Sequence, residues 1–422
     1  MSESNDNGFT ELFGQVREAS RHLLTLTDAG RSAAVIRLAE LVEENTPALL
    51  EANAADLAHM DPANPLYDRL RLNPERLAAI AADLRHVAAL PTPVGEEMER
   101  RTLPNGILLR KVRVPYGVIG VVYEARPNVT YDVFSLCIKS GNACILKGGA
   151  DAEHSNRAAI GLIRRALSDC GLPQECALLL PSTHEATAAM LSAVGYVDVG
   201  IPRGGRRLID FVRSTARVPV IETGAGVVHV YFDAEGSLEM GRGIIDNAKT
   251  RRVSVCNALD TLLVHSGRLV DLPALLEPLA RKGVELHADR RAFEALCGSY
   301  PAELLLHARE ADADREWMDM KMGVFTVDSV DEAIAHIDRH GSGHSESIVT
   351  DNEETARLFT SRVDASCVYV NLPTSFTDGG QFGLGAEIGI STQKLGPRGP
   401  MGLREITTTK YLLSGSGQLR PA

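Results

Sequence analysis

The sequence lacks long apolar runs and an apolar N-terminal segment. Its longest apolar runs, such as Val118–Val122 and Ala177–Leu180, are far shorter than the roughly 18 residues of a membrane span. Residues 1–6 are polar and acidic, without the apolar stretch of a signal peptide. We therefore expect a cytoplasmic protein with no membrane partner.

Basic residues are outnumbered by acidic ones. The 422 residues include 44 Lys and Arg against 55 Asp and Glu, which gives a formal net charge of −11. Nucleic acids and anionic membrane surfaces attract a basic face, so this balance argues against both as partners. A small anionic ligand is not excluded, because it needs only a local basic pocket.

Cysteine pairs are also missing. The chain has seven cysteines, an odd number, and no two of them have CxxC spacing. Disulfide frameworks and structural zinc sites depend on such pairs, so neither is expected. Seven reduced thiols and no bound metal are the simpler interpretation.

The common nucleotide and metal motifs are absent. No GxGxxG follows an expected strand, no GxxxxGK[ST] occurs, and His184-Glu185 lacks the second histidine of HExxH. A bound nucleotide must therefore be held in another way.

The sequence does contain a regular alternation of apolar runs and amphipathic stretches. Hydrophobic residues make up 44% and charged residues 23%, as in globular proteins. At roughly 100–200 residues per domain, this length indicates two or three domains. After a helical region at 10–90 and an extended ribbon at 107–117, strands are expected at 118–123, 143–146, 177–180, 197–201 and 218–221, and helices at 131–140, 156–170, 184–194 and 206–215. This pattern predicts an α/β fold with a doubly wound parallel sheet and helices on both faces.

A second α/β region follows residue 256. Strands are expected at 260–264, 323–327, 347–350 and 367–370, and helices at 270–281, 331–338 and 353–361. Residues 379–402 hold eight glycines, which is too many for a core element. They predict a loop whose backbone closely approaches another group.

Cys256 is the cysteine with the most suggestive neighbours. Lys249, Arg251 and Arg252 precede it closely in sequence. Nearby positive charge lowers a thiol pKa and favours the nucleophilic thiolate. The alternative is a small buried hydrophobe, which is our interpretation of Cys137, Cys144 and Cys367.

Three further strand ends carry candidate binding residues. Asn128 follows the first strand and is placed either to donate to an oxyanion or to cap the next helix. Gly204 and Gly205 join a strand to a helix, where they form either a phosphate-binding turn or a simple turn. Lys147 ends another strand, where it can reach a ribose or phosphate or lie in solvent.

Together these segments resemble the aldehyde dehydrogenase superfamily and, within it, the γ-glutamyl phosphate reductase family. The resemblance runs over nearly the whole chain. Its motifs are Val114–Gly120, Tyr123–Thr130, Ile201–Gly205, Ser254–Ala258 and Gly383–Thr392. The Arg-Pro-Asn and Ser-Val-Cys-Asn-Ala runs within them are typical of the phosphate reductases rather than of aldehyde dehydrogenases generally.

The resemblance implies reduction of L-glutamate 5-phosphate to L-glutamate 5-semialdehyde in proline biosynthesis. Cys256 would attack the acyl phosphate, release phosphate and form a thioester, which NADPH then reduces. Asn128 and the Cys256 backbone N–H would stabilise the tetrahedral intermediate. The resemblance assigns four residues to the cofactor: Lys147, Gly204, Gly205 and Glu316. Arg251 and Arg252 are candidates for the substrate phosphate.

Two positions depart from the superfamily pattern. Most members have Lys-Pro-Ser-Glu where this chain has Lys147-Gly148-Gly149-Ala150, so the carboxylate facing the adenosine ribose is absent. Its absence removes repulsion against a 2′-phosphate, which favours NADP over NAD. Glu222 aligns with the general base of thioester hydrolysis, a step that a phosphate reductase does not need. Its role stays open.

The resemblance also implies an aldehyde-dehydrogenase-like domain organisation. We expect an NADP-binding domain at 1–106 and 118–255, a catalytic domain at 256–395, and a small β oligomerisation arm at 107–117 and 396–422. The expected partners are a small-molecule substrate, further copies in a homo-oligomer and functional coupling to glutamate 5-kinase. Two alternatives remain: a hydrolytic semialdehyde dehydrogenase using Cys256 and Glu222, and a non-catalytic protein of the same fold.

Overall fold

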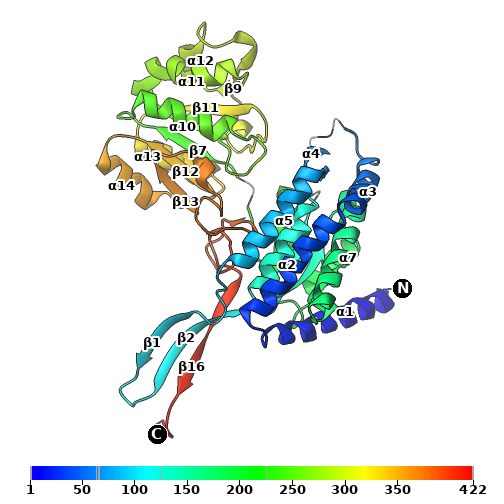
Figure 1. Cartoon of the computed structure of the whole chain (residues 1–422). Helices are drawn as coiled ribbons and strands as arrows, with labels where there is room; N and C mark the ends of the chain where they lie inside the picture. Colours follow the sequence, from blue (N-terminus) through cyan, green and yellow to red (C-terminus); the bar gives the residue numbers. More distant parts are fainter. Residues whose placement is uncertain (1, 63, 65–66, 125, 225, 421–422) are drawn as a thin grey trace. The chain divides into compact units, whose positions relative to one another are not determined.

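The chain divides into two compact units. The computed structural model describes residues 2–62, 64, 67–124, 126–224 and 226–420, with side chains from residue 8 onward (Figure 1). The first unit comprises 1–223, 383–389 and 401–422, and the second comprises 224–382 and 390–400. Ala125, which belongs to the Tyr123–Thr130 motif, and Ala225 lie outside the described residues.

The first unit contains a four-stranded parallel sheet. Its strands are β3 (Val118–Tyr123), β4 (Ala143–Lys147), β5 (Ala177–Leu179) and β6 (Val199–Arg203), in the order β5-β4-β3-β6. This arrangement confirms the parallel sheet predicted from the alternation. The expected strand at 218–221 forms only a single bridge, from Val220 to Gly200.

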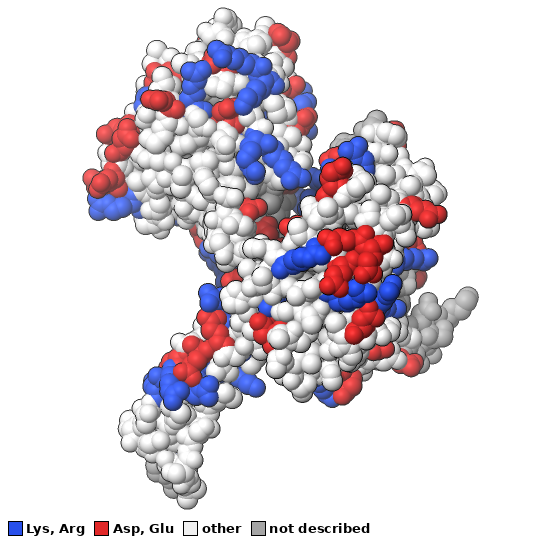
Figure 2. Space-filling model, viewed as in Figure 1, with Lys and Arg blue, Asp and Glu red and all other residues white. Residues whose placement is uncertain are grey.

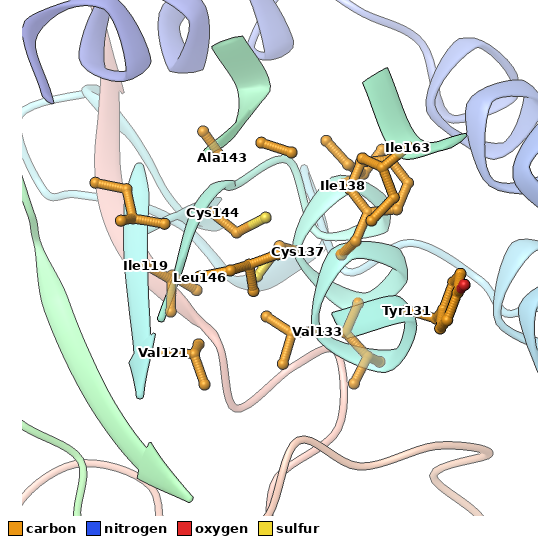
Figure 3. Packing of buried hydrophobic residues seen from close by; sticks show 14 of the residues in the cluster. Ile119, Val121, Tyr131, Val133, Cys137, Ile138, Ala143, Cys144, Leu146 and Ile163 are labelled. Atoms are coloured by element: carbon orange, nitrogen blue, oxygen red, sulfur yellow. The ribbon is translucent and has the colours of Figure 1, made fainter. Parts of the chain in front are cut away.

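Helices pack around this sheet through a continuous apolar core. Figure 3 shows Val133, Cys137 and Ile138 from one helix among Cys144 and Leu146 of β4. The helices of the first unit are α1 (Ser2–Leu23), α2 (Asp28–Glu44), α3 (Thr46–Leu57), α4 (Tyr67–Leu70), α5 (Pro74–Ala89), α6 (Asn128–Lys139), α7 (Glu153–Asp169), α8 (His184–Ser192) and α9 (Arg206–Thr215).

A three-stranded antiparallel ribbon completes the first unit. Strand β2 (Leu108–Pro115) lies between β1 (Glu97–Thr102) and β16 (Thr407–Ser414), as Figure 1 shows. The predicted arm at 107–117 and 396–422 therefore lacked one strand. The sequence of β1, Glu-Met-Glu-Arg-Arg-Thr, is almost entirely exposed and charged, so no apolar alternation marked it.

The second unit contains a seven-stranded sheet in which all pairings are parallel. Its order is β10-β9-β11-β8-β7-β12-β13. The strands are β7 (His229–Phe232), β8 (Thr261–His265), β9 (Glu285–Ala288), β10 (Leu305–His307), β11 (Lys321–Val327), β12 (Ser345–Val349) and β13 (Cys367–Val370). The helices are α10 (Leu238–Thr250), α11 (Leu272–Arg281), α12 (Arg290–Leu296), α13 (Val330–His340) and α14 (Glu353–Arg362).

The boundary between the units differs from the predicted domain boundary. We expected it after residue 255, whereas the contacts place it after residue 223. The reason is that β7 pairs with β8 and β12, which draws residues 224–255 into the second sheet. The glycine-rich segment is also divided between the units, and it forms two short strands, β14 (Ile390–Ser391) and β15 (Gly399–Pro400).

Charged side chains of both signs cover the two units. On the face shown in Figure 2, basic and acidic groups are interspersed over each of them. Among the described residues, no helix combines the length and apolar character needed to cross a membrane.

Candidate functional site

Cys256 lies in a tight turn of the second unit, between α10 and β8. Its side chain is half-buried, and the turn is closed by a hydrogen bond from Ala258 N to Val255 O of 3.1 Å. The next residue fixes the turn, because the Asn257 amide donates to Thr377 O at 2.9 Å. Thr374 Oγ1 in turn donates to Asn257 O at 2.9 Å. The thiol is thus held in place and still reachable.

Gly226 packs directly against the Cys256 backbone. A Cβ atom at this position would collide with the carbonyl oxygen of Cys256, so only glycine allows this approach. Gly226 N also donates to Glu316 Oε1 at 3.2 Å. The second unit therefore brings together Glu316, Gly226 and Cys256, which lie far apart in sequence.

The three cations that precede Cys256 do not act as one group. Lys249 is completely buried, and its Nζ donates to Leu259 O at 3.0 Å. Burial lowers its pKa to about 8, and Asp260 is its main counter-charge. Arg251 and Arg252 are exposed. The Lys249 ammonium is hydrogen-bonded to Leu259 O, and its support of the Cys256 thiolate remains a prediction.

The other cysteines lie in different surroundings. Cys137 and Cys144 are buried in the core of the first unit (Figure 3), and Cys367 is buried in the second. Burial and the neighbouring Cys137 raise the pKa of Cys144, which keeps it a thiol. Cys297 is exposed, and none of the described cysteines takes part in a disulfide.

Asn128 is the first residue of α6 in the first unit. The N-cap position of this helix is Pro127, so Asn128 lies one residue beyond the capping position that the alternative assigned to it. Its Nδ2 instead donates to Asp132 Oδ2, one turn later, at 2.9 Å. A carboxylate partner fixes the amide with its nitrogen toward Asp132, which leaves a second N–H on the same nitrogen. Burial raises the pKa of Asp132 to about 7.

Gly204 and Gly205 directly precede α9, and a carboxylate lies against them. Gly205 N donates to Glu124 Oε2 at 2.9 Å, and a Cβ at Gly204 would collide with the same carboxylate. The Glu124 carboxylate therefore faces this helix N-terminus, and phosphate binding by the turn remains a prediction. Lys147 is half-buried at the end of β4, where burial lowers its pKa and Glu124 opposes that shift.

A hollow of about 230 Å³ opens beside the end of β4 in the first unit. Gly148 and Gly149 form part of its wall, and Arg157, Arg164 and Glu153 line another part; Arg157 is ion-paired with Glu153. Glycine is required at 148, since a Cβ there would collide with the Asn156 amide. Arg157 and Arg164 could not be predicted as site residues from the sequence, because on an amphipathic helix they look like ordinary solvated arginines.

Glu222 forms a two-pronged ion pair within the first unit. Arg213 donates to it through Nε at 2.9 Å and through a terminal nitrogen at 2.5 Å. This hydrogen-bonded partner holds the pKa of Glu222 below its ordinary value. A carboxylate so paired is a weaker base than an unpaired one.

The candidate residues fall into two sets. Asn128, Lys147, Gly204 and Gly205 belong to the first unit, whereas Glu316, Cys256, Arg251 and Arg252 belong to the second. The pairing of Asn128 with Cys256 in one reaction remains a prediction.

Comparison with known proteins gives the family. A γ-glutamyl phosphate reductase from Pelodictyon phaeoclathratiforme is 57% identical over 407 residues, which cover 96% of this chain and 97% of the relative. The chain belongs to the γ-glutamyl phosphate reductase family. It is thus an oxidoreductase, which argues against the non-catalytic alternative. Among models of protein families, none matches the chain.

Solved structures agree with this family, and more distant ones show the fold. The γ-glutamyl phosphate reductase of Thermotoga maritima aligns with a TM-score of 0.93 at 40% identity, covering 97% of this chain and 99% of that one. An acetylating aldehyde dehydrogenase from Geobacillus thermoglucosidasius aligns with a TM-score of 0.71 at 15% identity, covering 99% of each. The fold is therefore aldehyde-dehydrogenase-like, as the sequence motifs predicted.

Proposed function

We propose that this γ-glutamyl phosphate reductase family member reduces L-glutamate 5-phosphate to L-glutamate 5-semialdehyde in proline biosynthesis, with NADPH as reductant and release of phosphate. The observation that carries this proposal is the held, half-buried Cys256 between α10 and β8. A nucleophile needs both a fixed position and access to its substrate, and this turn provides both.

In the first step, the Cys256 thiolate attacks the acyl carbon of the substrate. A C–S bond forms, the C–O bond to the phosphate breaks, and inorganic phosphate leaves with the bonding electrons. Arg251 and Arg252 are exposed cations close in sequence to the nucleophile, and we assign them to the leaving phosphate. The product on the protein is a thioester of Cys256.

The tetrahedral intermediate carries a negatively charged oxygen that needs hydrogen-bond donors. Asn128 has a suitable N–H, because Asp132 accepts only one of its two amide hydrogens. We assign the second N–H to the oxyanion, together with the Cys256 backbone N–H. Donors held in advance in this way stabilise the transition state without having to reorganise.

The hollow beside β4 fits the adenosine end of a dinucleotide phosphate. Its glycine wall allows close approach. Arg164 and Arg157 line it, the latter paired with Glu153, and we assign these two arginines to the 2′-phosphate. Lys147 at the strand end is assigned to the ribose, Gly204 and Gly205 to the phosphates, and Glu316 to the nicotinamide ribose. When bound, NADPH supplies the hydride that reduces the thioester.

The hydrolytic alternative is less well supported. Thioester hydrolysis needs a base to activate water, and Glu222 is engaged by Arg213. The acyl phosphate reaction needs no such base, since phosphate rather than water exchanges with the thioester. We therefore favour the phosphate-dependent reaction.

The requirement for phosphate tests the proposal directly. In the reverse direction, NADP reduction by glutamate 5-semialdehyde should require inorganic phosphate, because phosphate must attack the thioester to release the acyl group. The assay measures NADPH absorbance with and without phosphate. Steady turnover without phosphate, giving glutamate, would establish the hydrolytic alternative instead.

Cofactor choice gives a second prediction. Replacing Ala150 with Glu restores the carboxylate that the superfamily usually has, on an exposed position three residues after Lys147. Like charges close together repel by on the order of 1–4 kcal/mol, so kcat/KM for NADPH should fall about tenfold. The measurement is the ratio of kcat/KM for NADPH to kcat/KM for NADH in each variant. Ala150→Gln is the matched control and should keep the original ratio; the same ratio in both variants would contradict the assignment.

The remaining assignments concern assembly and location. We propose a homo-oligomer built through the β1-β2-β16 ribbon, whose outer strand β16 exposes Tyr411 and Leu413. We also propose a cytoplasmic location and functional coupling to glutamate 5-kinase, because an acyl phosphate hydrolyses readily in water.

A further inference from the structure

The turn that bears Cys256 rests on a buried carboxylate. Asp260 is only 3% exposed, and it lies four residues after Cys256, just before β8. Its Oδ1 accepts a hydrogen bond from Trp317 N at 2.8 Å, and its Oδ2 accepts one from Val228 N at 3.4 Å. One carboxylate thus joins two chain segments that approach the nucleophile from different parts of the sequence.

Both of these segments lead to the backbone that packs on Cys256. Trp317 directly follows Glu316, and Val228 lies two residues after Gly226. Glu316 Oε1 and Gly226 N are themselves hydrogen-bonded, and Gly226 packs on the Cys256 carbonyl. Anchoring at Asp260 therefore sets the position of the Glu316 carboxylate and of the backbone that supports the turn.

The Glu316 segment needs such an anchor because its backbone is strained. Met318 has a φ of 53°, in the left-handed region that residues with a side chain rarely adopt. A residue in this region keeps its conformation only when the surrounding structure enforces it. The hydrogen bond from Trp317 N to Asp260 is the adjacent contact that can do so.

A buried cation accompanies this carboxylate. Lys249 is 0% exposed on α10, the helix that leads into the Cys256 turn. Burial raises the pKa of Asp260 to about 7, and the hydrogen bond from Trp317 N and the Lys249 ammonium oppose that shift. Glu316 acts on the same carboxylate with the opposite sign. In its ionised form Asp260 accepts both N–H groups as charge-assisted contacts.

We propose that Asp260, with Lys249 as its buried counter-charge, is a positioning residue that holds the Glu316 and Gly226 segments against Cys256. Its importance for catalysis rests on the proposed nucleophilic role of Cys256, whereas its effect on the turn does not. The substitution Asp260→Asn tests this. An amide of the same shape can accept only one of the two N–H groups, because its other end is a donor.

Trp317 is a built-in reporter of this anchor. It is the single tryptophan of the chain, it is buried, and its ring lies against His287 and Arg315. In Asp260→Asn we expect a red shift of its emission and stronger quenching by acrylamide. We also expect the rate of Cys256 alkylation by iodoacetamide to change relative to that of the exposed Cys297. The value of kcat should be about tenfold lower, which corresponds to the loss of one charge-assisted hydrogen bond.

Two variants separate positioning from stability. Asp233→Asn alters another buried carboxylate of the same unit, which accepts hydrogen bonds from the hydroxyls of Tyr231 and Thr350. It should lower the unfolding temperature and leave emission, alkylation and kcat unchanged. The double variant Lys249→Met/Asp260→Asn leaves no unpaired buried charge. It should regain unfolding temperature without regaining kcat or the native emission.

Each result bears on the proposal. If Asp260→Asn lowers only the unfolding temperature, with native emission, alkylation and kcat, the positioning role is overturned. If Asp260→Asn does not fold, Lys249→Met alone must still shift Trp317 emission and Cys256 alkylation, or the proposal fails. Emission and alkylation do not depend on turnover, so a failure of the proposed reaction would be recognised separately.

Discussion

Cys256→Ala should abolish NADPH oxidation by glutamate 5-phosphate and NADP reduction in the reverse assay. The reaction proposed here passes through a covalent bond to this sulfur, and alanine offers no atom to form it. Loss of a covalent nucleophile costs on the order of 10⁴- to 10⁶-fold in kcat. The measurement is turnover by absorbance, together with the unfolding temperature, which should change little because the thiol is only half-buried.

A matched control is available in the same unit. Cys297 is exposed and lies at the end of α12, so Cys297→Ala should retain full activity. Mass spectrometry adds a positive observation: incubation with the acyl phosphate and no cofactor should add a glutamyl group to the native protein and not to Cys256→Ala. Substantial turnover in Cys256→Ala would require a mechanism without the thioester.

Asn128→Ala should give the second largest loss. Removing one oxyanion donor costs about 10²- to 10³-fold in kcat. Because the oxyanion exists only at the tetrahedral stage, kcat and kcat/KM should fall together while KM changes little. Steady-state kinetics at varied concentrations of acyl phosphate measure kcat and KM separately.

The control for this variant is an asparagine with a known structural role. Asn73 caps α5, with its Oδ1 accepting from Arg76 N at 2.7 Å, so Asn73→Ala should cost about 1 kcal/mol of stability and no activity. Asn128 makes no capping bond, so its alanine variant should show the opposite pattern. A native kcat in Asn128→Ala would remove this residue from the proposed mechanism.

Much of the fold could be predicted from the sequence because its core elements carry strong local signals. Strand β3 is a continuous apolar run buried along its whole length, and α7 shows a clear apolar stripe. Strands β9 and β10 had no such signal, since they are short and contain His287 and His307. Strand pairing, rather than periodicity, places them in the sheet.

The candidate site was predictable only where a residue type itself carries the chemistry. Cys256 stood out in this way, whereas the oxyanion role of Asn128 followed only from the family resemblance. The partners that set their geometry did not stand out, because Asp132, Asp260 and Arg213 look like ordinary charged residues in sequence. Lys249 shows the limit most clearly: its sequence position says nothing of its complete burial or of the hydrogen bond that its ammonium donates to Leu259 O.

The ribbon has a consequence for the chain while it is being made. Strand β2 pairs on one side with β16, and Arg113 and Thr407 in this pair are 294 residues apart. At about 5–20 residues per second, the β2 edge waits roughly 15–60 s for its partner on the ribosome. During that time it presents Arg110, Lys111 and Arg113, and charged side chains on an open edge discourage pairing with other nascent chains. Arg110 and Arg113 pair with Glu97 and Glu96 on the β1 side of the ribbon, which is already made, so we expect the charged β2 edge to resist pairing with other nascent chains.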